Sequence, residues 1–425
     1  MKKFIKTITP LLIIMVIFVI MTRSSCIDTD PPTPATNVGD TLWIHEKPVL
    51  ENTTWIRDMP MAIGNDGSIY YIADGANNTF EPARVYAINK DDGSFKWKTD
   101  QMESSHPGSN IVVADDGTVY ILSGHRLYSI DPNSGSFNWE WEVPETIVFD
   151  GNDVYSYGAV GGLALKNNGD LILKTPGSGS YYRAMYCVNP QGTTKWYRVI
   201  GSNGSNMGTT VGSTGIIFAY ETWGEPYGYD QDKYLYAVNP DDGGVYWRTQ
   251  MNYSGTGGNN IAVTDNGDLL CSIANDSLGL LNSATGEYIW KVLAQTSYKY
   301  KLIGKEGLVS VYDQWTGRHY YNISTGAEEK VIESAAGDPM SFDNNGNYYR
   351  GVSPGMVCYN KNGEVIWNFN SGGSKGWSLT ISNDNIIYLV SGDKVFAIQG
   401  DSPLAQSGWP RASHDNRNTY NYSKH

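Results

Sequence analysis

Residues 235–247 read LYAVNPDDGGVYW, a short alternating strand followed by a polar turn and the start of a second strand. The spacing Gly-x-x-x-Trp that ends this stretch recurs along the chain, at Gly39/Trp43, Gly93/Trp97, Gly135/Trp139, Gly192/Trp196, Gly243/Trp247, Gly286/Trp290 and Gly363/Trp367. An eighth copy begins at Gly326 and has Lys330 in the place of the Trp. Internal repetition of this kind is the signature of a repeat architecture.

A second hairpin lies upstream in most units, and its turn is usually an Asx-Gly pair, as in GNDGSIYYI, ADDGTVYIL, KNNGDLILK, TDNGDLLCS and DNNGNYYRG. Gly supplies the positive φ that such tight turns require. Each unit therefore contains two hairpins, or four strands, and successive units are 37 to 57 residues apart. This spacing is close to the roughly 40 to 50 residues of a four-stranded propeller blade.

The two ends of the repeat predict how the ring closes. The last unit supplies strands at residues 379–390 and 394–399 but no Gly-x-x-x-Trp strand, whereas the first such strand, Gly39 to Trp43, precedes any strand that could accompany it. Pairing the N-terminal strand into the last blade removes an unpaired edge. We therefore expect an all-β fold, an eight-bladed β-propeller of four-stranded antiparallel blades over residues 39–400. A β-sandwich array or a seven-bladed ring would leave one fourth strand without a partner.

Bulky side chains at the end of the fourth strands are expected to pack on the neighbouring blade, because one blade cannot bury both of its faces alone. These structural residues are Trp43, Trp97, Trp139, Trp196, Trp247, Trp290 and Trp367.

Strands that end in Asn-Pro or Asp-Pro before x-(Ser/Thr/Asp)-Gly-x-x-x-Trp resemble the pyrroloquinoline-quinone-like (PQQ-like) β-propeller repeat family, over nearly the whole mature chain. The size, the eight blades and the N-terminal closure are similar to the BamB-type outer-membrane assembly lipoproteins. The resemblance implies a protein partner in the cell envelope. The repeat is specific for the fold and weak for function, because function depends on sites added to a fold.

Residues 1–25 are typical of a signal peptide, with a basic start followed by an apolar run of about 11 residues at 11–21, too short to span a bilayer comfortably. Ser24 and Ser25 before Cys26 resemble a lipobox, although Arg23 departs from that pattern. We expect Cys26 to carry the lipid anchor that is the protein's only membrane contact; an ordinary cleaved signal or an uncleaved anchor is the alternative. Residues 26–38 form a Pro-rich tether. The predicted location is the cell envelope, as an outer-membrane lipoprotein or a periplasmic protein, with secretion as the alternative.

Composition narrows the class of partner. The 425 residues contain 31 Lys and Arg against 44 Asp and Glu, a formal net charge of −13, which excludes nucleic-acid binding through bulk charge. With 13 Trp and 30 Tyr, the chain has a large apolar surface to bury, which excludes disorder.

Quinoprotein dehydrogenases share these repeats, and the resemblance implies that such enzymes hold quinone and Ca²⁺ with carboxylate and amide side chains beneath a disulfide of adjacent cysteines. No adjacent cysteines occur here, and Cys187, Cys271 and Cys358 are predicted to be small buried residues. The acidic pairs Asp91-Asp92, Asp115-Asp116 and Asp241-Asp242 are predicted to form turns. We expect no catalytic residue, cofactor or metal, with a PQQ- and Ca²⁺-dependent dehydrogenase as the alternative.

Both short turns of every unit are expected on one face of the ring, so the longer connections should emerge on the other face. The connection with the most aromatic and acidic side chains is residues 221–233 (ETWGEPYGYDQDK), and this mixture is suited to peptide or sugar binding. The candidate binding residues are Trp223, Tyr227, Tyr229 and Asp230, which Tyr181 and Tyr182 could join. The other interpretation is that these rings pack within their own loop.

Residues 401–425 lack strand alternation and are predicted to be a C-terminal tail that docks on the ring. Together these features predict a non-catalytic, exported β-propeller scaffold that binds a protein partner, with a glycan- or peptide-binding propeller as a further alternative.

Overall fold

The structure is a computed structural model that describes residues 37–46, 53–56, 59–75, 82–104, 108–156, 161–175, 182–201, 208–223, 232–251, 261–274, 277–294, 301–313, 317–332 and 339–424. The chain divides into two units, residues 1–35 and 36–425, and every described residue belongs to the second. Cys26 and most of the predicted tether therefore lie outside the described residues.

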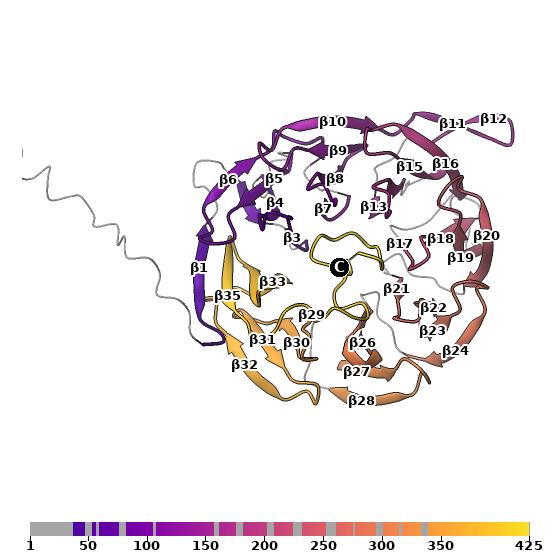
Figure 1. Cartoon of the computed structure of the whole chain (residues 1–425). Coiled ribbons are helices and arrows are strands. Elements are labelled where there is room, and N and C mark those ends of the chain that lie inside the picture. The colour runs from indigo at the N-terminus through magenta and orange to yellow at the C-terminus, as the bar shows by residue number, and fades with distance from the viewer. Residues whose placement is uncertain are drawn as a thin grey trace, which may run out of the picture. The chain divides into compact units, whose positions relative to one another are not determined.

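Eight antiparallel blades surround a common axis, each with an inner strand, two middle strands and an outer strand; the order follows the chain except in blade 8, whose outer strand is the first strand of the chain (Figure 1). Middle strands are buried on both faces, as in β8 (Val119–Ser123), while outer strands alternate, as in β20 (Val245–Met251). The described residues contain one helix, the 3-10 turn η1 (Lys305–Gly307), and none long and apolar enough to cross a membrane. The predicted all-β, eight-bladed fold is confirmed.

Blades 1 to 4 are formed by the first half of the chain. Blade 1 comprises β3 (Ala62–Ile63), β4 (Ile69–Gly75), β5 (Arg84–Ile88) and β6 (Phe95–Lys98), with β2 (Thr53–Ile56) also paired to β4. Blade 2 comprises β7 (Val112–Val113), β8, β9 (Arg126–Ile130) and β10 (Phe137–Glu142). Blade 3 comprises β13 (Gly161–Leu165), β14 (Leu171–Lys174), β15 (Arg183–Val188) and β16 (Thr194–Gly201). Blade 4 comprises β17 (Thr209–Val211), β18 (Ile217–Trp223), β19 (Asp232–Val238) and β20.

Blades 5 to 8 follow the same order. Blade 5 comprises β21 (Ala262–Val263), β22 (Leu269–Ala274), β23 (Ser277–Leu281) and β24 (Tyr288–Leu293). Blade 6 comprises β25 (Leu302–Ile303), β26 (Leu308–Asp313), β27 (Gly317–Asn322) and β28 (Glu328–Ile332). Blade 7 comprises β29 (Pro339–Phe342), β30 (Tyr348–Gly351), β31 (Met356–Tyr359) and β32 (Val365–Phe369). Blade 8 comprises β33 (Gly376–Ile381), β34 (Ile386–Ser391), β35 (Lys394–Gln399) and β1 (Thr41–Glu46).

One hairpin lies outside the eight blades. Strands β11 (Thr146–Phe149) and β12 (Asn152–Tyr155) pair with each other between blades 2 and 3 and project from the outer edge of the ring (Figure 1). Asp150 and Gly151 form its turn, and both have positive φ.

The ring closes through the N-terminal strand. Strand β1 pairs antiparallel with β35, so that Ile44 lies opposite Phe396. Beyond the strands, the Gly39 amide donates to the Gln399 carbonyl at 2.8 Å, and the Gln399 amide donates to the Asp40 carbonyl at 2.9 Å. The predicted closure is confirmed, and a seven-bladed ring is excluded.

Tryptophan side chains join most of the blades. Six indoles donate Nε1–H to a backbone carbonyl in the third-to-fourth turn of the next blade, at 2.7 to 3.2 Å: Trp43 to Lys90, Trp97 to Pro132, Trp139 to Pro190, Trp196 to Pro240, Trp247 to Ser283 and Trp290 to Ile323. Each ring also covers the glycine of that turn. A Cβ on Gly93 would lie 2.5 Å from Trp43, and a Cβ on Gly135 would lie 2.5 Å from Trp97. Both glycines have positive φ, so the repeat requires Gly there for two reasons.

Two junctions depart from this arrangement. Trp367 of blade 7 faces blade 8, where no turn connects the third strand, β35, to the fourth, β1, because they come from opposite ends of the propeller. The buried Nε1 of Trp367 has no hydrogen-bond partner. In blade 6, Lys330 replaces the Trp and places its ammonium 4.5 Å from the centre of the Tyr320 ring.

We expect Trp97→Phe to lower the free energy of unfolding about 1 kcal/mol more than Trp367→Phe does. Both changes remove part of a packed ring, but only the first removes a hydrogen bond and leaves the Pro132 carbonyl unpaired. Urea unfolding followed by tryptophan fluorescence and circular dichroism would measure the difference. Equal losses would contradict a hydrogen-bonding role for the indole.

The C-terminal hub, which we define as residues 401–424, lies on the axis (Figure 1). In six blades, the last residue of the inner strand donates its amide to a hub carbonyl at 2.8 to 3.0 Å: Ile63 to Asn416, Val113 to Arg417, Leu165 to Thr419, Val211 to Tyr420, Ile303 to Trp409 and Phe342 to Pro410. These donors immediately precede the first-to-second turns. The hub therefore fills the axis at the end of the ring where the short turns lie.

Side chains of the hub are as buried as a protein core. Trp409, Asn418, Thr419 and Asn421 are all 0% exposed. The Asn418 amide donates to the carbonyls of Ile111, at 2.9 Å, and Pro60, at 3.1 Å, and so links two blades. Asn418 also has a φ of 57°, a conformation that Asn tolerates better than most residues.

We expect Asn418→Gly to destabilise the protein by about 1–3 kcal/mol, because buried carbonyls lose their donor while glycine retains the backbone conformation. Hydrogen exchange should show faster exchange at the hub-bonded amides, such as those of Ile63 and Val113. Exchange at the middle strands, including β8, is the internal control. Unchanged exchange at the inner amides would show that the hub does not hold the blades.

Candidate functional site

Most residues predicted to bind a ligand, on the face where the longer connections emerge, lie outside the described residues. Tyr181, Tyr227, Tyr229 and Asp230 fall there, and Trp223 is described only through its backbone, which pairs with Asp232 at the end of β18. Their role therefore stays a prediction.

Tyr182 is described, and its surroundings favour a structural role. Its ring centre lies 5.4 Å from that of Phe149 in β11, and its amide donates to the Tyr155 carbonyl in β12 at 3.1 Å. Tyr182 thus fastens the projecting hairpin to blade 3.

The three described cysteines agree with the prediction of small buried residues. Cys187, Cys271 and Cys358 are free thiols with 0% exposure. Burial raises the pKa of each thiol to about 12, so that each stays protonated at neutral pH. They are therefore poor nucleophiles and poor metal ligands.

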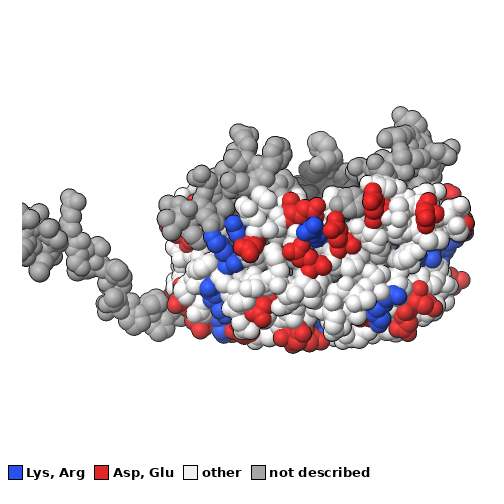
Figure 2. Space-filling model, turned by 90° about the horizontal axis from the view of Figure 1, so that it is seen from above, with Lys and Arg blue, Asp and Glu red and all other residues white. Residues whose placement is uncertain are grey.

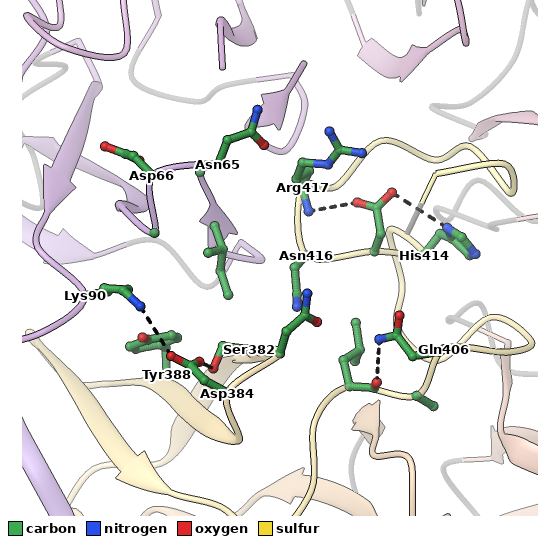
Figure 3. Close-up of a pocket in the computed structure, with 17 residues that line it drawn as sticks. Asn65, Asp66, Lys90, Ser382, Asp384, Tyr388, Gln406, His414, Asn416 and Arg417 are labelled. Carbon is green, nitrogen blue, oxygen red and sulfur yellow. Dashed lines mark hydrogen bonds and ion pairs between the residues drawn. The ribbon is translucent and has the colours of Figure 1, made fainter. Parts of the chain in front are cut away.

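A cavity of about 710 Å³ lies where blades 8 and 1 meet the hub (Figure 3). We call it the seam cavity. Its walls are three turns and two hub segments: residues 63–67, Lys90, residues 382–384, Tyr388, residues 404–406 and residues 414–417. The volume is within the roughly 300–1,000 Å³ typical of ligand sites.

Lys90 brings a cation into the seam cavity. Its Nζ lies 3.4 Å from Asp384 Oδ2 and 4.0 Å from Asp91 Oδ1, which are long distances for ion pairs. The side chains of Lys90, Asp384 and Asp91 are 38%, 50% and 77% exposed, respectively. Its aliphatic stem lies over Gly67, where an added Cβ would come within 2.3 Å of Lys90 Cδ. The cation is therefore held loosely on a well-packed stem.

The same repeat position is proline in three other blades, at Pro132, Pro190 and Pro240. The Pro132 and Pro190 rings approach the equivalent glycines of their own blades, Gly117 and Gly169. Lys361 occupies the same repeat position in blade 7, so the repeats do not single out Lys90. Only the folded ring shows that Asp384 of another blade lies beside Lys90.

Tyr388 lies at the wall of the cavity on β34. Its side chain is 0% exposed, and its hydroxyl has no hydrogen-bond partner. Burial raises the pKa of Tyr388, and the negative charges of Asp384 and Asp91 raise that pKa further. Tyr388 therefore stays a neutral hydrogen-bond donor at physiological pH.

Blade 1 contributes an acidic turn. Burial opposes ionisation of Asp66, but hydrogen bonds from Lys96, at 2.7 Å, and Ser68 hold its pKa below the usual value. Asn65 reaches across to blade 2 and donates to the Asp115 carbonyl at 2.7 Å. These groups already have partners within the ring.

The hub wall is polar and internally bonded. Burial disfavours the charge of Asp415, but the nearby His414 ring, with Nδ1 3.7 Å from Oδ2, and hydrogen bonds from Thr419 hold its pKa below the usual value. Arg417 extends away to Asp115, with Nη1 2.6 Å from Oδ1. The hub thus supplies a rigid wall, and Lys90, Asp384 and Tyr388 supply the groups that a ligand could contact.

The Ca²⁺ implied by the repeat resemblance finds no matching cluster of acidic side chains in the described part of the chain. No group of three or more His, Cys, Asp or Glu side chains there could hold a metal ion. At the turn end of the axis, the hub occupies the space with the fully buried Trp409. The described residues therefore do not fit the Ca²⁺ of such a cofactor site.

Fold and repeat together define a propeller of the PQQ-like repeat class. The family described as "Outer membrane protein assembly factor BamB" matches residues 63–233 and 231–329. These matches cover more than half of the chain, which therefore belongs to this family. No curated protein sequence matches the chain significantly.

Solved structures with the same fold include a BamB protein and dehydrogenases. BamB from Moraxella catarrhalis is 16% identical with a TM-score of 0.57, over 81% of this chain and 97% of that one. Quinohemoprotein alcohol dehydrogenase from Comamonas testosteroni is 13% identical with a TM-score of 0.59, over 87% and 78%. A europium-containing methanol dehydrogenase is 11% identical with a TM-score of 0.59, over 85% and 90%. At these identities the likeness shows the fold alone.

We expect titration of the protein with pyrroloquinoline quinone and Ca²⁺ to give no saturable absorbance change and no alcohol-dependent dye reduction, because the described residues lack a matching ligand set. A quinoprotein dehydrogenase assayed in parallel is the positive control. Saturable binding with dye reduction would contradict the expectation and support the enzyme alternative.

Proposed function

We propose that this chain is a non-catalytic scaffold of the cell envelope that binds protein partners during outer-membrane protein assembly, anchored through Cys26. Family membership supports the assembly role. The leader at residues 1–25 and the Ser-Ser-Cys sequence at 24–26 support export and lipid attachment. The acid excess of the chain speaks against nucleic acid as a partner.

The observation that carries the proposal is the hub. A propeller used as a scaffold needs a rigid ring, and the hub bonds to the inner strands of six blades while filling the axis with its own side chains. Loops and turns on such a rigid ring can bind a partner without reorganising the fold. The side of the ring visible in Figure 2 carries Asp and Glu interspersed with fewer Lys and Arg.

Affinity capture from cross-linked native envelopes tests the proposal. The affinity tag should be inserted between Asp150 and Gly151, because this exposed hairpin tip projects from the ring, whereas a C-terminal tag would follow the buried hub. We expect outer-membrane assembly proteins to be enriched over a mock capture from cells with untagged protein. Their absence from captures of a tagged protein with native melting behaviour would contradict the assembly role.

A further inference from the structure

We propose that the seam cavity binds a neutral sugar, a mono- or disaccharide, whose hydroxyl groups bond to Lys90 and Asp384 on one side and to Asn416 and Gln406 of the hub on the other. Such a small-ligand site goes beyond the proposed scaffold function and does not depend on it. All four side chains line the cavity, and none of them is among the binding residues predicted from the sequence. The wall has balanced charges, free hydrogen-bonding groups and no exposed aromatic ring, and each property favours this class of ligand.

The charges of the cavity wall are balanced. Each Asp, Lys and Arg that lines the cavity has an oppositely charged neighbour: Asp384 has Lys90, Asp66 has Lys96, Arg417 has Asp115, and Asp415 has the buried Arg411. An ionic ligand would therefore find no unpaired counter-charge in the wall, and its own charge would stay uncompensated. A neutral ligand avoids this cost.

The ion pair of Lys90 and Asp384 has hydrogen-bonding capacity to spare. Both side chains are partly exposed, and the bond between them is long, with 3.4 Å from Nζ to Oδ2. An ammonium has three N–H donors and a carboxylate oxygen has two lone pairs, so one bond between them leaves groups free on both. A ligand hydroxyl beside the pair can therefore accept from Lys90 and donate to Asp384 without disturbing the charge balance.

Two amide side chains of the hub each have one end in use and the other end free. Gln406 Nε2 donates to the Leu404 carbonyl at 2.9 Å, which leaves Oε1 as an acceptor. Asn416 Oδ1 accepts from Arg411 Nη1 at 3.3 Å, which leaves Nδ2 as a donor. Neither free end has a hydrogen-bond partner among the described residues. Figure 3 shows Asn416 between the ion pair and Gln406.

A ligand that bonds to all four groups has to donate as well as accept. An ionised carboxylate only accepts and cannot bond to Gln406 Oε1, whereas an ammonium only donates and cannot bond to Asn416 Nδ2. A hydroxyl group does both, and a sugar carries several hydroxyls on one ring. The cavity of about 710 Å³ has room for such a ligand.

The apolar part of the wall is aliphatic. Ile63, Leu404 and Ala405 line the cavity, whereas its two aromatic residues, Tyr388 and His414, are 0% and 1% exposed. A flat heteroaromatic ligand, such as a nucleobase, would therefore find no ring face on which to stack. The C–H groups of a sugar ring need only an aliphatic surface, which the wall provides.

Calorimetric titration of the purified full-length protein tests the inference directly. The neutral probes are glucose, galactose, mannose, N-acetylglucosamine, maltose and cellobiose; glucuronate and glucosamine are the charged probes, and adenosine is the heteroaromatic probe. We expect at least one neutral sugar to bind saturably, and about fivefold or more tightly than any charged probe or adenosine. Hydrogen exchange with that sugar bound should slow at residues 382–384 and 404–406.

Variants assign the binding to the cavity. Gln406→Ala removes an acceptor and should weaken sugar binding about fivefold, while Gln191→Ala, at an exposed turn of blade 3, should leave it unchanged. Asp384→Asn leaves the Lys90 charge unbalanced, so the affinity for glucuronate should rise about threefold or more relative to the neutral sugar. Lys90→Met leaves the Asp384 charge unbalanced and should favour glucosamine in the same way. Asp116→Asn, at the equivalent turn position of blade 2, should change neither preference.

Several results would overturn the inference: no saturable binding of any neutral sugar in the panel, tighter binding of a charged probe or adenosine by the parental protein, or unchanged sugar affinity in Gln406→Ala with parental melting. Sugar binding that is lost in Trp223→Ala but kept in Gln406→Ala would place the sugar at residues 221–233 and refute the cavity assignment. Envelope capture reports on the scaffold role alone, so either proposal can fail while the other stands.

Discussion

Packing of an indole on the glycine of the next blade is the interaction on which this ring depends. Each contact combines burial of a large aromatic surface with a hydrogen bond to a turn carbonyl, and the glycine has no side chain to hold the ring away. Because the same contact recurs at six of the eight junctions, the blades at those junctions are fixed relative to each other by the same geometry. The blades therefore form one rigid body onto which loops and turns can be added without loss of the fold.

The hub adds a second constraint from the inside. The indoles join neighbours along the circumference, whereas the hub joins blades across the axis through inner-strand amides and through Asn418 and Asn421. The path of the hub also decides where the seam cavity lies, because the chain leaves blade 8 and turns toward blade 7 before it reaches the others. The seam cavity is a consequence of that path, and its position is fixed by the backbone more than by any one side chain.

Much of the fold could be predicted because the sequence pattern of a blade repeats along the chain. The Gly-x-x-x-Trp repeat placed all eight blades, and the unmatched strands at Gly39–Trp43 and at residues 394–399 identified the closing pair. The path of residues 401–424 could not be predicted, because irregular backbone shows no repeating sequence pattern. The inner-strand amides that bond to it are present in every blade and so do not indicate which blades it contacts. The seam cavity could not be predicted for the same reason, because hub residues form part of its wall. The predicted aromatic patch around Trp223 lies mostly outside the described residues.

Closure by strands from the two ends of the propeller also sets an order of events during synthesis. Strand β1 is made first, yet its partner β35 is among the last strands to leave the ribosome; the Lys394–Glu46 pair spans 348 residues. Until then β1 has an open edge, and the indole of Trp43 lacks the strand pairing that positions it. Contacts so distant in sequence are slow to form. The nascent chain therefore has to keep its first strand apart from other strand edges until its last blade arrives, which exposes it to mispairing for longer than a propeller closed by a local hairpin.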